Sequence, residues 1–251
     1  MGIRIKWLTN SAFEISYKNH VITTDPSVRF MAYKGLDENS YSKPDFILVT
    51  HLHWDHISEI RSLYSRYRPV IFTGALGRRE LVRYLDANQV DVVPVYPGLS
   101  LDYGFFRLDA LFAIHRNNKK TISAQLEAVK AKCTLIDDDI LGLQEIGSLE
   151  MTNYLITFDN GFRILVWGGE FSEPQKNLLK NCAPDLALMQ FSASRNDEYA
   201  DLVRAVNPKA LIPYHHDSSC TKEKWLPQLQ SYRDKCPCEF IILDNEQTIE
   251  F

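Results

Sequence analysis

Apolar and polar residues alternate along the first part of the chain with the period of a half-buried β-strand. The alternation covers residues 3–7 and returns over 13–17, where charged or polar side chains separate the apolar ones. A third strand is expected over 21–24 and ends at Asp25-Pro26, because proline lacks the N–H group that strand pairing requires. The pattern therefore predicts that the chain begins as a β-meander.

The pattern then changes to buried strands that alternate with helices. Residues 46–49 form a continuous apolar run, which is typical of a strand buried on both faces. Apolar residues recur at helical spacing over 56–67, and Pro69 ends that helix. Further strands are predicted over 70–73, 90–95, 105–114, 154–158, 162–167, 186–189, 210–212 and 240–243, and further helices over 80–85, 121–132, 198–206 and 225–232. The stretch 117–150 interrupts this alternation of strands and helices.

Composition and charge exclude several classes of protein. The 251 residues are 45% hydrophobic and 24% charged, which excludes a disordered or collagen-like chain. The formal net charge of −4 gives no support to a dedicated nucleic-acid-binding module, which is usually basic. The N-terminus has no signal-peptide pattern and no apolar run reaches membrane-spanning length, so no membrane association is expected.

The cysteines favour a reducing compartment. Their number, five, is odd and they are scattered along the chain, which fits free thiols better than a disulfide framework. Cys236-Pro237-Cys238 is a candidate metal or redox pair, but it lacks the two intervening residues of a C-x-x-C motif, and two ordinary loop thiols are favoured. A cytoplasmic protein is therefore predicted.

Histidines gather at the predicted ends of strands. Six of the seven fall in three short windows: they are His51, His53, His56, His115, His215 and His216. In the densest window, H-x-H-x-D-H, His51 and His53 point to the same side of an extended loop and can hold one metal ion. Asp55 and His56 turn into the start of a helix and face a second position. Imidazole and carboxylate ligands favour Zn²⁺, with Mn²⁺ or Fe²⁺ as alternatives where the ligand set is richer in oxygen.

These residues resemble the metal-binding motifs of the metallo-β-lactamase superfamily. The resemblance rests on the H-x-H-x-D-H segment, on His115 after a strand, on Glu170 after two glycines, and on His215 within Pro-Tyr-His. It spans nearly the whole chain. Residues 7–13 and the Thr-Asp-Pro segment at 24–26 are most similar to the short metal-dependent hydrolases of the ascorbate-6-phosphate lactonase type.

The resemblance implies a fold. It predicts an α/β (α+β) protein with a four-layer αββα sandwich, formed by a single domain over residues 1–251. The stretch at about 117–150 would be a helical insertion, and a lid if it folds over the site.

The resemblance also implies ligands for each metal position. The first metal would be held by His51, His53 and His115, and the second by Asp55, His56 and His215. Glu170 would lie between the two ions, where the superfamily normally has aspartate. Because glutamate is longer by one methylene group, Glu170 would bridge with a changed metal spacing, bind one ion only, or leave the site. One or two divalent ions are therefore expected.

Two neighbours of these ligands are also assigned. Asp25 resembles the superfamily's carboxylate that orients a ligand histidine, although it also fits a plain Asp-Pro turn. Adjacent residues of an extended segment point in opposite directions, so only one of His215 and His216 is expected to face the metals. The Pro-x-His pattern favours His215. His20 is expected at the surface and is assigned no role.

The predicted function is metal-dependent hydrolysis. A metal at such an open site lowers the pKa of bound water towards about 7, and the hydroxide then attacks a small ester, lactone or phosphoester. The resemblance implies that the catalytic residue Asp55 holds this hydroxide or passes on its proton. Arg116, Lys119 and Lys120 follow His115 closely and are expected to bind a phosphate group of the substrate, the alternative being a solvated charged turn.

Two other functions fit the same residues. A non-catalytic member of the fold would bind a metal or ligand without turnover, and the departure at Glu170 supports it. A nucleic-acid-processing phosphodiesterase would need a basic surface, which the net charge of −4 does not indicate. A small-molecule substrate is the expected partner.

Overall fold

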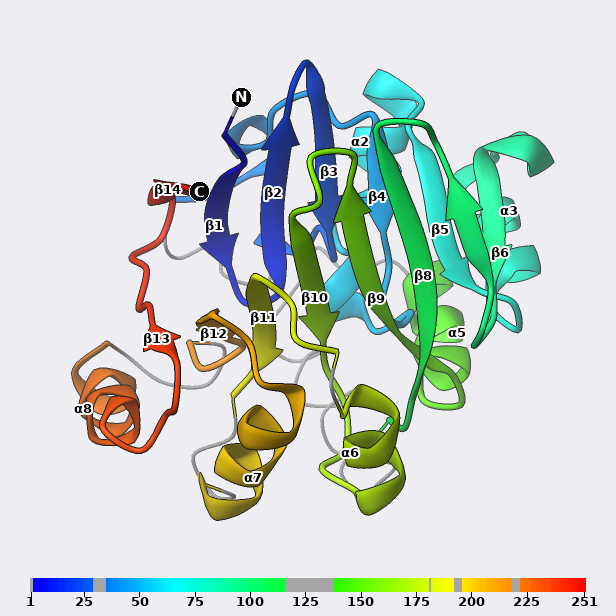
Figure 1. The fold of residues 1–251 in the computed structure, drawn as a ribbon. Helices are drawn as coiled ribbons and strands as arrows, with labels where there is room; N and C mark the ends of the chain where they lie inside the picture. Colours follow the sequence, from blue (N-terminus) through cyan, green and yellow to red (C-terminus); the bar gives the residue numbers. More distant parts are fainter. Residues whose placement is uncertain (1, 29–34, 116–137, 181, 192–195, 218–221) are drawn as a thin grey trace.

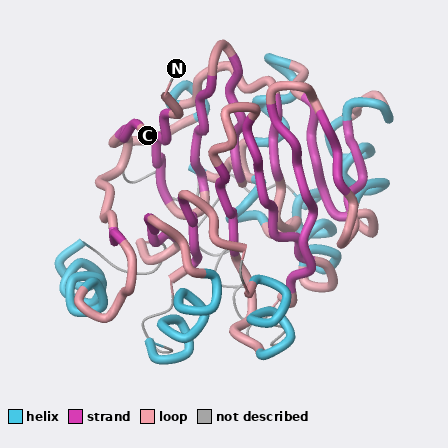
Figure 2. Tube along the Cα trace, in the orientation of Figure 1, coloured by secondary structure: helices cyan, strands magenta, loops and turns pink. Residues whose placement is uncertain are grey.

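The computed structural model describes residues 2–28, 35–115, 138–180, 182–191, 196–217 and 222–251. In this part of the chain, two seven-stranded sheets pack against each other, and helices cover their outer faces (Figure 1). Figure 2 shows the strands gathered in the centre and the helices around them. The predicted αββα arrangement is confirmed.

The first sheet contains strands from both ends of the chain. In spatial order its strands are β14 (Thr248–Glu250), β1 (Arg4–Thr9), β2 (Ala12–Tyr17), β3 (His20–Thr24), β4 (Phe46–Leu48), β5 (Val70–Gly74) and β6 (Val92–Val95). Strands β1 to β3 pair antiparallel as the predicted meander, whereas β3 to β6 pair parallel. The parallel pairing begins with β3 and β4. A parallel pair needs a crossover between its strands, and the segment after Asp25 joins these two.

The second sheet is also mixed. In spatial order its strands are β13 (Glu239–Phe240), β12 (Ala210–Tyr214), β11 (Leu186–Gln190), β10 (Arg163–Trp167), β9 (Met151–Phe158), β8 (Phe106–Ala113) and β7 (Ser100–Asp102). Strands β7 to β10 pair antiparallel, and β10 to β13 pair parallel. The β9–β10 hairpin turns at Gly161, whose φ of 86° lies in the left-handed region that glycine adopts readily.

Helices form the two outer layers. They are α1 (Trp54–Ile57), α2 (Ile60–Tyr67), α3 (Arg78–Leu85), α5 (Asp138–Gly147), α6 (Glu173–Leu179), α7 (Asn196–Val206) and α8 (Lys222–Arg233), with short 3-10 turns η2 (Glu38–Ser40) and η3 (Gln89–Asp91). Helices α1, α2, α3 and α5 pack on the first sheet, and α6 to α8 pack on the second. None of the described helices is both long and apolar enough to cross a bilayer.

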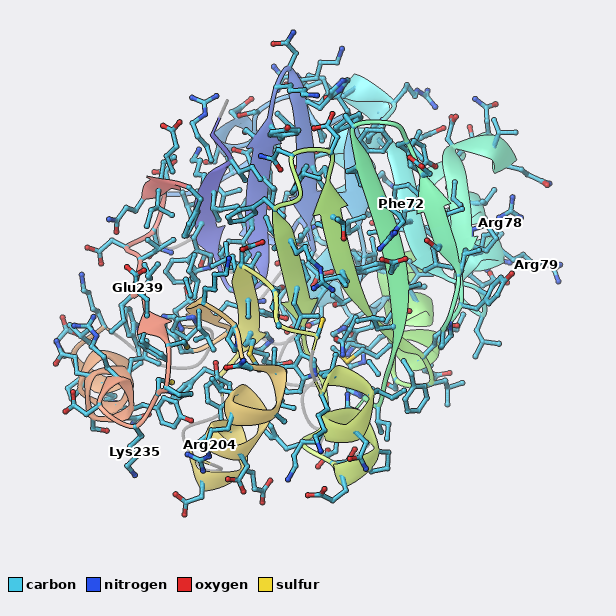
Figure 3. The ribbon with its side chains drawn as sticks, in the orientation of Figure 1. Phe72, Arg78, Arg79, Arg204, Lys235 and Glu239 are labelled. Carbon is cyan, nitrogen blue, oxygen red and sulfur yellow. The ribbon has the colours of Figure 1, made fainter. Side chains whose placement is uncertain are left out.

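The buried strands supply two different cores because successive side chains of a strand point to opposite faces. In β4, Phe46 and Leu48 face the other sheet, whereas Ile47 faces the helices. In β5, Phe72 lies between the sheets, while Arg79 and Arg204 lie on the outside of the molecule (Figure 3). The apolar runs of the sequence thus reflect strands that are covered on both sides.

The helix expected over 56–67 is divided into α1 and α2, and the backbone partners explain the division. Within a continuous helix, the Glu59 N–H would donate to the Asp55 carbonyl. It donates instead to the Pro26 carbonyl at 3.0 Å, and the Asp55 carbonyl accepts from Asn10 Nδ2 at 2.7 Å. Tertiary partners therefore end α1 after one turn, just beyond the residues of the histidine motif.

Other elements differ from the sequence predictions at the edges of the fold. The edge strands β7 and β14 and the helix α6 were not predicted, and β13 is shorter than the strand expected over 240–243. Edge strands of two or three residues bury too few side chains to leave a periodic pattern. The helix expected over 121–132 lies outside the described residues. The end of the stretch 117–150 forms α5, which packs beside α1 and α3.

Candidate metal centre

The histidine motif lies at one edge of the sandwich, where parallel strands end. In the second sheet, β8 runs in the same direction as β10 to β12, because β9 pairs antiparallel with both β8 and β10. Ends of strands with one direction meet at a common edge, where open α/β sheets generally bind their ligands. The residues beyond these ends are Asp25 after β3, His51 and His53 after β4, His115 after β8, Glu170 after β10 and His215 after β12.

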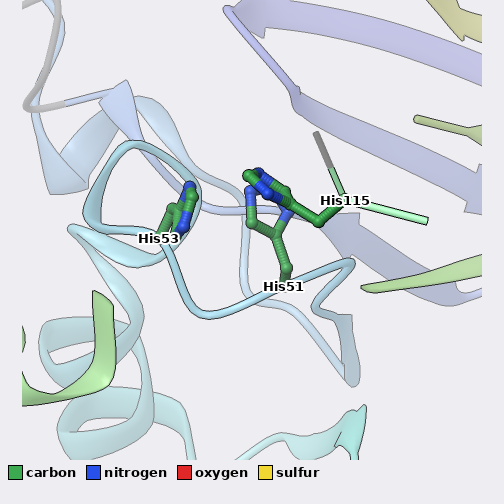
Figure 4. A group of neighbouring side chains, drawn as sticks. All are labelled: His51, His53 and His115. Carbon is green, nitrogen blue, oxygen red and sulfur yellow. The ribbon is translucent and has the colours of Figure 1, made fainter. Parts of the chain in front are cut away.

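The first group of candidate ligands consists of His51, His53 and His115. One potential ligand atom from each residue lies within 4.8 Å of the others. The ring centroid of His53 is 4.4 Å from that of His51 and 4.5 Å from that of His115. Figure 4 shows two of the rings on the loop after β4 and the third at the end of β8. The structure thus brings together three imidazoles from segments far apart in sequence.

The second group consists of Asp55, His56 and His215, whose potential ligand atoms also lie within 4.8 Å of one another. Asp55 Oδ2 is 3.5 Å from His215 Nε2 and 3.9 Å from His56 Nε2. The two groups adjoin, since the ring centroids of His51 and His56 are only 4.0 Å apart. The six residues therefore form one continuous centre with two possible ion positions.

Burial keeps the imidazoles of the first group neutral. It lowers the pKa of His53 to about 3 and that of His115 to about 4, from the ordinary value of 6.5. For His51, burial and then the neighbouring histidines hold the pKa well below 6.5. A neutral imidazole has a free nitrogen lone pair, which is the form that binds a metal.

Unlike the histidines of the first group, Asp55 and His56 are favoured in their charged forms. Burial favours the neutral carboxyl of Asp55, but the charge of His56 and the hydrogen bond with His215 outweigh this effect and lower the pKa of Asp55 below its ordinary 3.8. Burial also favours neutral His56, but the carboxylates of Asp25 and Asp55 outweigh it and raise the pKa of His56 above 6.5. Asp55 is therefore a carboxylate at neutral pH and has the charge that a cation would bind.

Asp25 orients the ring of His56 through a hydrogen bond. Its Oδ2 lies 2.8 Å from His56 Nδ1, and the same carboxylate accepts from Thr50 N and Thr50 Oγ1, both at 2.7 Å. Asp25 is only 1% exposed. The bond to Nδ1 leaves His56 Nε2 directed at Asp55, which is the orientation expected of a carboxylate that positions a ligand histidine.

Asn10 was not singled out in the sequence, yet it joins three parts of the centre. Its Nδ2 donates to the Asp55 carbonyl at 2.7 Å, and its carbonyl accepts from His215 N at 3.1 Å. Its own N–H donates to the buried carboxylate of Asp217 at 3.1 Å. The only sequence signal was its place in the segment 7–13 that carries the resemblance.

Three residues of the centre have left-handed backbone conformations. The φ angle is 49° at Asn10, 39° at Asp25 and 65° at His215. Asparagine, aspartate and histidine adopt this region more often than most other residues, and a backbone hydrogen bond can restrain a residue in it. The bond from His215 N to the Asn10 carbonyl supplies such a restraint. The conformation also turns His215 towards Asp55 at the end of β12.

The remaining predicted residues lie outside these two groups. Glu170 belongs to neither group; its N–H donates to the Ile114 carbonyl at 2.7 Å, and its charge raises the pKa of His115 against the effect of burial. The ring of His216 lies between Trp7 and Trp225, with centroid distances of 5.1 and 4.3 Å. Arg116, Lys119 and Lys120 lie outside the described residues.

Comparison with known proteins decides the family. Residues 4–215 match the family described as the beta-lactamase superfamily domain. The chain belongs to this superfamily. It is also 28% identical over 229 residues to a UPF0173 metal-dependent hydrolase of Polaromonas, a match that covers 86% of this chain and 77% of that relative. The superfamily predicted from the histidine motif is therefore confirmed, and the relative bears the name of the predicted enzyme class.

Solved structures show the same fold. A metallo hydrolase from Ignicoccus hospitalis has a TM-score of 0.70 at 14% identity, over 100% of this chain and 99% of its own. A metallo-beta-lactamase fold protein from Bacillus subtilis has a TM-score of 0.68 at 12% identity, over 100% of both chains. At such identities the likeness concerns the fold alone. The narrower resemblance to the ascorbate-6-phosphate lactonase type is not confirmed by these matches.

The residues present fit the divalent metals expected in this superfamily. His115 Nδ1 is buried and has no hydrogen-bond partner among the residues that the structure describes. A buried polar atom without a partner is costly, and a bound cation would satisfy it. Five imidazoles with one carboxylate also match the nitrogen-rich ligand sets of Zn²⁺ sites.

The metal-free protein is expected to lose stability as the pH falls from about 7 to 4. His51, His53 and His115 bind protons near pH 6.5 in the unfolded chain but only at lower pH when folded, so acid favours unfolding. Each adds up to about 1.4 kcal/mol per pH unit, and His56 does not offset them below pH 6.5, because its raised pKa keeps it protonated there in both the folded and the unfolded chain. Thermal unfolding of chelator-treated protein between pH 7 and 5 checks this slope.

The matched control for this pH dependence is His53→Asn, which removes one of the three groups. Its melting temperature should fall less steeply between pH 7 and 5 than that of the wild type. Equal slopes for the two proteins would show that the buried imidazoles do not cause the acid sensitivity.

Proposed function

We propose that this protein is a metal-dependent hydrolase of a small ester, lactone or phosphoester. The observation that carries the proposal is the pair of adjoining ligand groups at the ends of the strands, with three neutral imidazoles in one and the carboxylate of Asp55 in the other. The name of the Polaromonas relative, a metal-dependent hydrolase, supports the same reaction class.

The proposed ligands are the six residues of the two groups. His51, His53 and His115 would hold one ion, and Asp55, His56 and His215 would hold the other. Two groups favour two ions over one, and the nitrogen-rich ligand set favours Zn²⁺, with Mn²⁺ or Fe²⁺ as alternatives. Glu170 remains the proposed bridging carboxylate, supported by its place after β10 and its electrostatic effect on His115.

When bound, such ions lower the pKa of water and polarise the substrate oxygen. The protein's own contribution lies in Asp55, whose low pKa makes Oδ2 available to accept a hydrogen bond from the attacking water. His215 Nε2, 3.5 Å away, holds this carboxylate oxygen in position. Asp55 and His215 are each 20% exposed in their side chains, so both are accessible from the open edge of the sheets.

The substrate class is proposed from the sequence. Arg116, Lys119 and Lys120 follow His115 closely in the sequence, and three cations so near a candidate ligand along the chain favour a phosphorylated substrate. The resemblance to the ascorbate-6-phosphate lactonase type supports a lactone or ester bond. The free thiols at Cys182, Cys236 and Cys238 support the proposed cytoplasmic location.

A second candidate function is metal or ligand binding without turnover. The observation in its favour is that Glu170, where the superfamily normally has a bridging aspartate, belongs to neither ligand group. A chain of this kind would take up metal through the six remaining ligands and hydrolyse nothing.

A hydrolysis assay distinguishes the two functions. The protein, reconstituted with Zn²⁺ or Mn²⁺, is tested against a p-nitrophenyl ester, a γ-lactone and bis-p-nitrophenyl phosphate. We expect hydrolysis of at least one class, and Asp55→Asn should lower kcat by about 10²–10⁴-fold because the amide cannot accept the proton. His20→Gln, which changes a histidine outside the centre, should have wild-type activity.

One result would contradict the hydrolase proposal, and another would contradict the role of Asp55. Metal-loaded wild type that is inactive on all three classes supports binding without turnover. Activity that is equal in Asp55→Asn and in the wild type would remove Asp55 from the reaction.

A further inference from the structure

Helix α5 packs directly against the loop that carries His51 and His53. A Cβ atom placed on Gly147, the last residue of α5, would lie 2.7 Å from the Leu52 carbonyl carbon and 2.8 Å from His53 N. Real Cβ contacts are essentially never this close, so the approach requires glycine. The end of α5 and the metal-binding loop are therefore in backbone contact.

Gln144 supplies a second link from α5 to the same loop. His53 is the N-cap residue of α1 but makes no side-chain capping bond. Gln144 Oε1 instead accepts from Trp54 N at 2.9 Å. An amide from another helix thus satisfies one of the free N–H groups at the start of α1, in the place of a local cap.

Ser148, immediately after α5, contacts the imidazole of His53. Its Oγ lies 2.9 Å from His53 Nε2 and 3.0 Å from the carbonyl oxygen of Gln144. Ser148 is 8% exposed and His53 is 7% exposed, so water does not compete freely for these bonds. One ring nitrogen of His53 is therefore hydrogen-bonded to a hydroxyl. The ring itself lies next to those of His51 and His115, at centroid distances of 4.4 and 4.5 Å.

The two contacts of Ser148 together determine which nitrogen of His53 carries the proton. A carbonyl oxygen can only accept, so the single hydroxyl proton of Ser148 must point at the Gln144 carbonyl. Ser148 Oγ is then an acceptor towards His53, and His53 Nε2 must be the donor. A neutral imidazole has only one N–H, so Nδ1 is left with a lone pair.

We infer that Ser148 is a positioning residue for the metal centre: it selects the Nε2–H tautomer of His53 and so presents Nδ1 to the ion of the first group. The inference rests on the proposed function, because it assigns Ser148 a role towards the metal of that site. Ser148 acts on His53 as Asp25 acts on His56, with a neutral hydroxyl in place of a carboxylate. The stretch expected as a lid thus contributes, through its described end, a support for the metal-binding loop.

The tautomer can be measured without metal. In ¹⁵N-labelled, chelator-treated protein, two-bond ¹H–¹⁵N spectra report which ring nitrogen of each histidine is protonated, and His53→Asn identifies the His53 signal by its loss. We expect Nε2–H at His53 in the wild type. In Ser148→Ala, we expect a mixture of the two tautomers, because the acceptor that favours Nε2–H is gone. A wild-type His53 protonated at Nδ1 would overturn the inference.

Metal affinity is the second measurement. Competition of Zn²⁺ between the metal-free protein and a chromophoric chelator should show binding to Ser148→Ala weakened by about 10–100-fold, the range typical of lost partners behind a ligand histidine. Ser148→Thr keeps the hydroxyl and should restore most of the affinity. Loss of affinity in both variants would assign the effect to packing and overturn the inference.

The matched control is Ser62→Ala. Ser62 Oγ also bonds to a backbone carbonyl near a helix end, that of Glu59 at 3.2 Å, but it is not among the residues that contact a ligand histidine. The Ser62→Ala variant should bind Zn²⁺ with the same affinity as the wild type. Wild-type Zn²⁺ affinity in Ser148→Ala would contradict this inference alone, whereas a wild-type protein that binds neither Zn²⁺ nor Mn²⁺ would overturn the proposed function as well.

Discussion

His51→Ala is expected to empty the first metal position and to weaken binding at the second. His51 lies at the junction of the two groups, with its ring centroid 4.4 Å from that of His53, 4.0 Å from that of His56 and 4.8 Å from that of His115. Loss of a direct ligand should reduce affinity by more than the roughly 10–100-fold that loss of an outer partner costs. Elemental analysis of protein purified without a chelator or an affinity-tag metal measures the metal content per chain.

His20→Ala is the matched control for this experiment. His20 is the one histidine outside the three windows, its side chain is 41% exposed, and its ring stacks on Phe105 at 4.0 Å. Its removal should leave the metal content unchanged. If His51→Ala retained the metal content of His20→Ala, the assignment of the centre to these residues would be wrong.

Asp25→Ala is expected to lower the free energy of unfolding by about 3–5 kcal/mol, the range seen when one partner of a buried charged pair is removed. The reason is that one buried carboxylate accepts from Thr50 N, Thr50 Oγ1 and His56 Nδ1, and all three groups would lose this charged partner inside the protein. Urea unfolding of the metal-free protein measures the change. Metal binding should also weaken, since His56 would no longer be held.

Asp45→Ala provides the comparison, because Asp45 has similar partners in a more exposed place. Its Oδ2 accepts from Val21 N at 2.9 Å and lies 3.5 Å from His20 Nδ1, but its side chain is 34% exposed. Water can replace these bonds, so the expected loss is at most about 1 kcal/mol. Similar losses for the two variants would show that the support of His56 by Asp25 contributes little to stability.

Predictions based on local pattern agree best with the structure. The alternation over 3–7 and 13–17 corresponds to β1 and β2, and the apolar run at 46–49 corresponds to β4. The strands predicted over 154–158 and 162–167 correspond to β9 and β10, which pair as an antiparallel hairpin across Asp159-Asn160-Gly161. These elements are specified by side-chain period and turn chemistry, which a short window of sequence contains.

Elements without such a pattern were missed. Helix α6 begins at the capping residue Ser172, but it buries Gln175 as well as Leu179, so no apolar stripe marks it. The division of the helix expected over 56–67 depends on partners at Pro26 and Asn10, which are distant in sequence. A helical period contains no information about such distant partners.

The sequence by itself determined the superfamily and the kinds of ligand, because H-x-H-x-D-H combines metal-binding chemistry with a strand end and a helix start in six consecutive residues. Only the tertiary structure decided how those ligands are held. Asn10 lies in the β1–β2 turn, 45 residues from its partner Asp55. Gln144 lies in α5 and Ser148 directly after it, and Ser148 is 95 residues from its partner His53. Their roles arise from hydrogen bonds that exist only once the two sheets and α5 have packed, and neither spacing nor periodicity records such bonds.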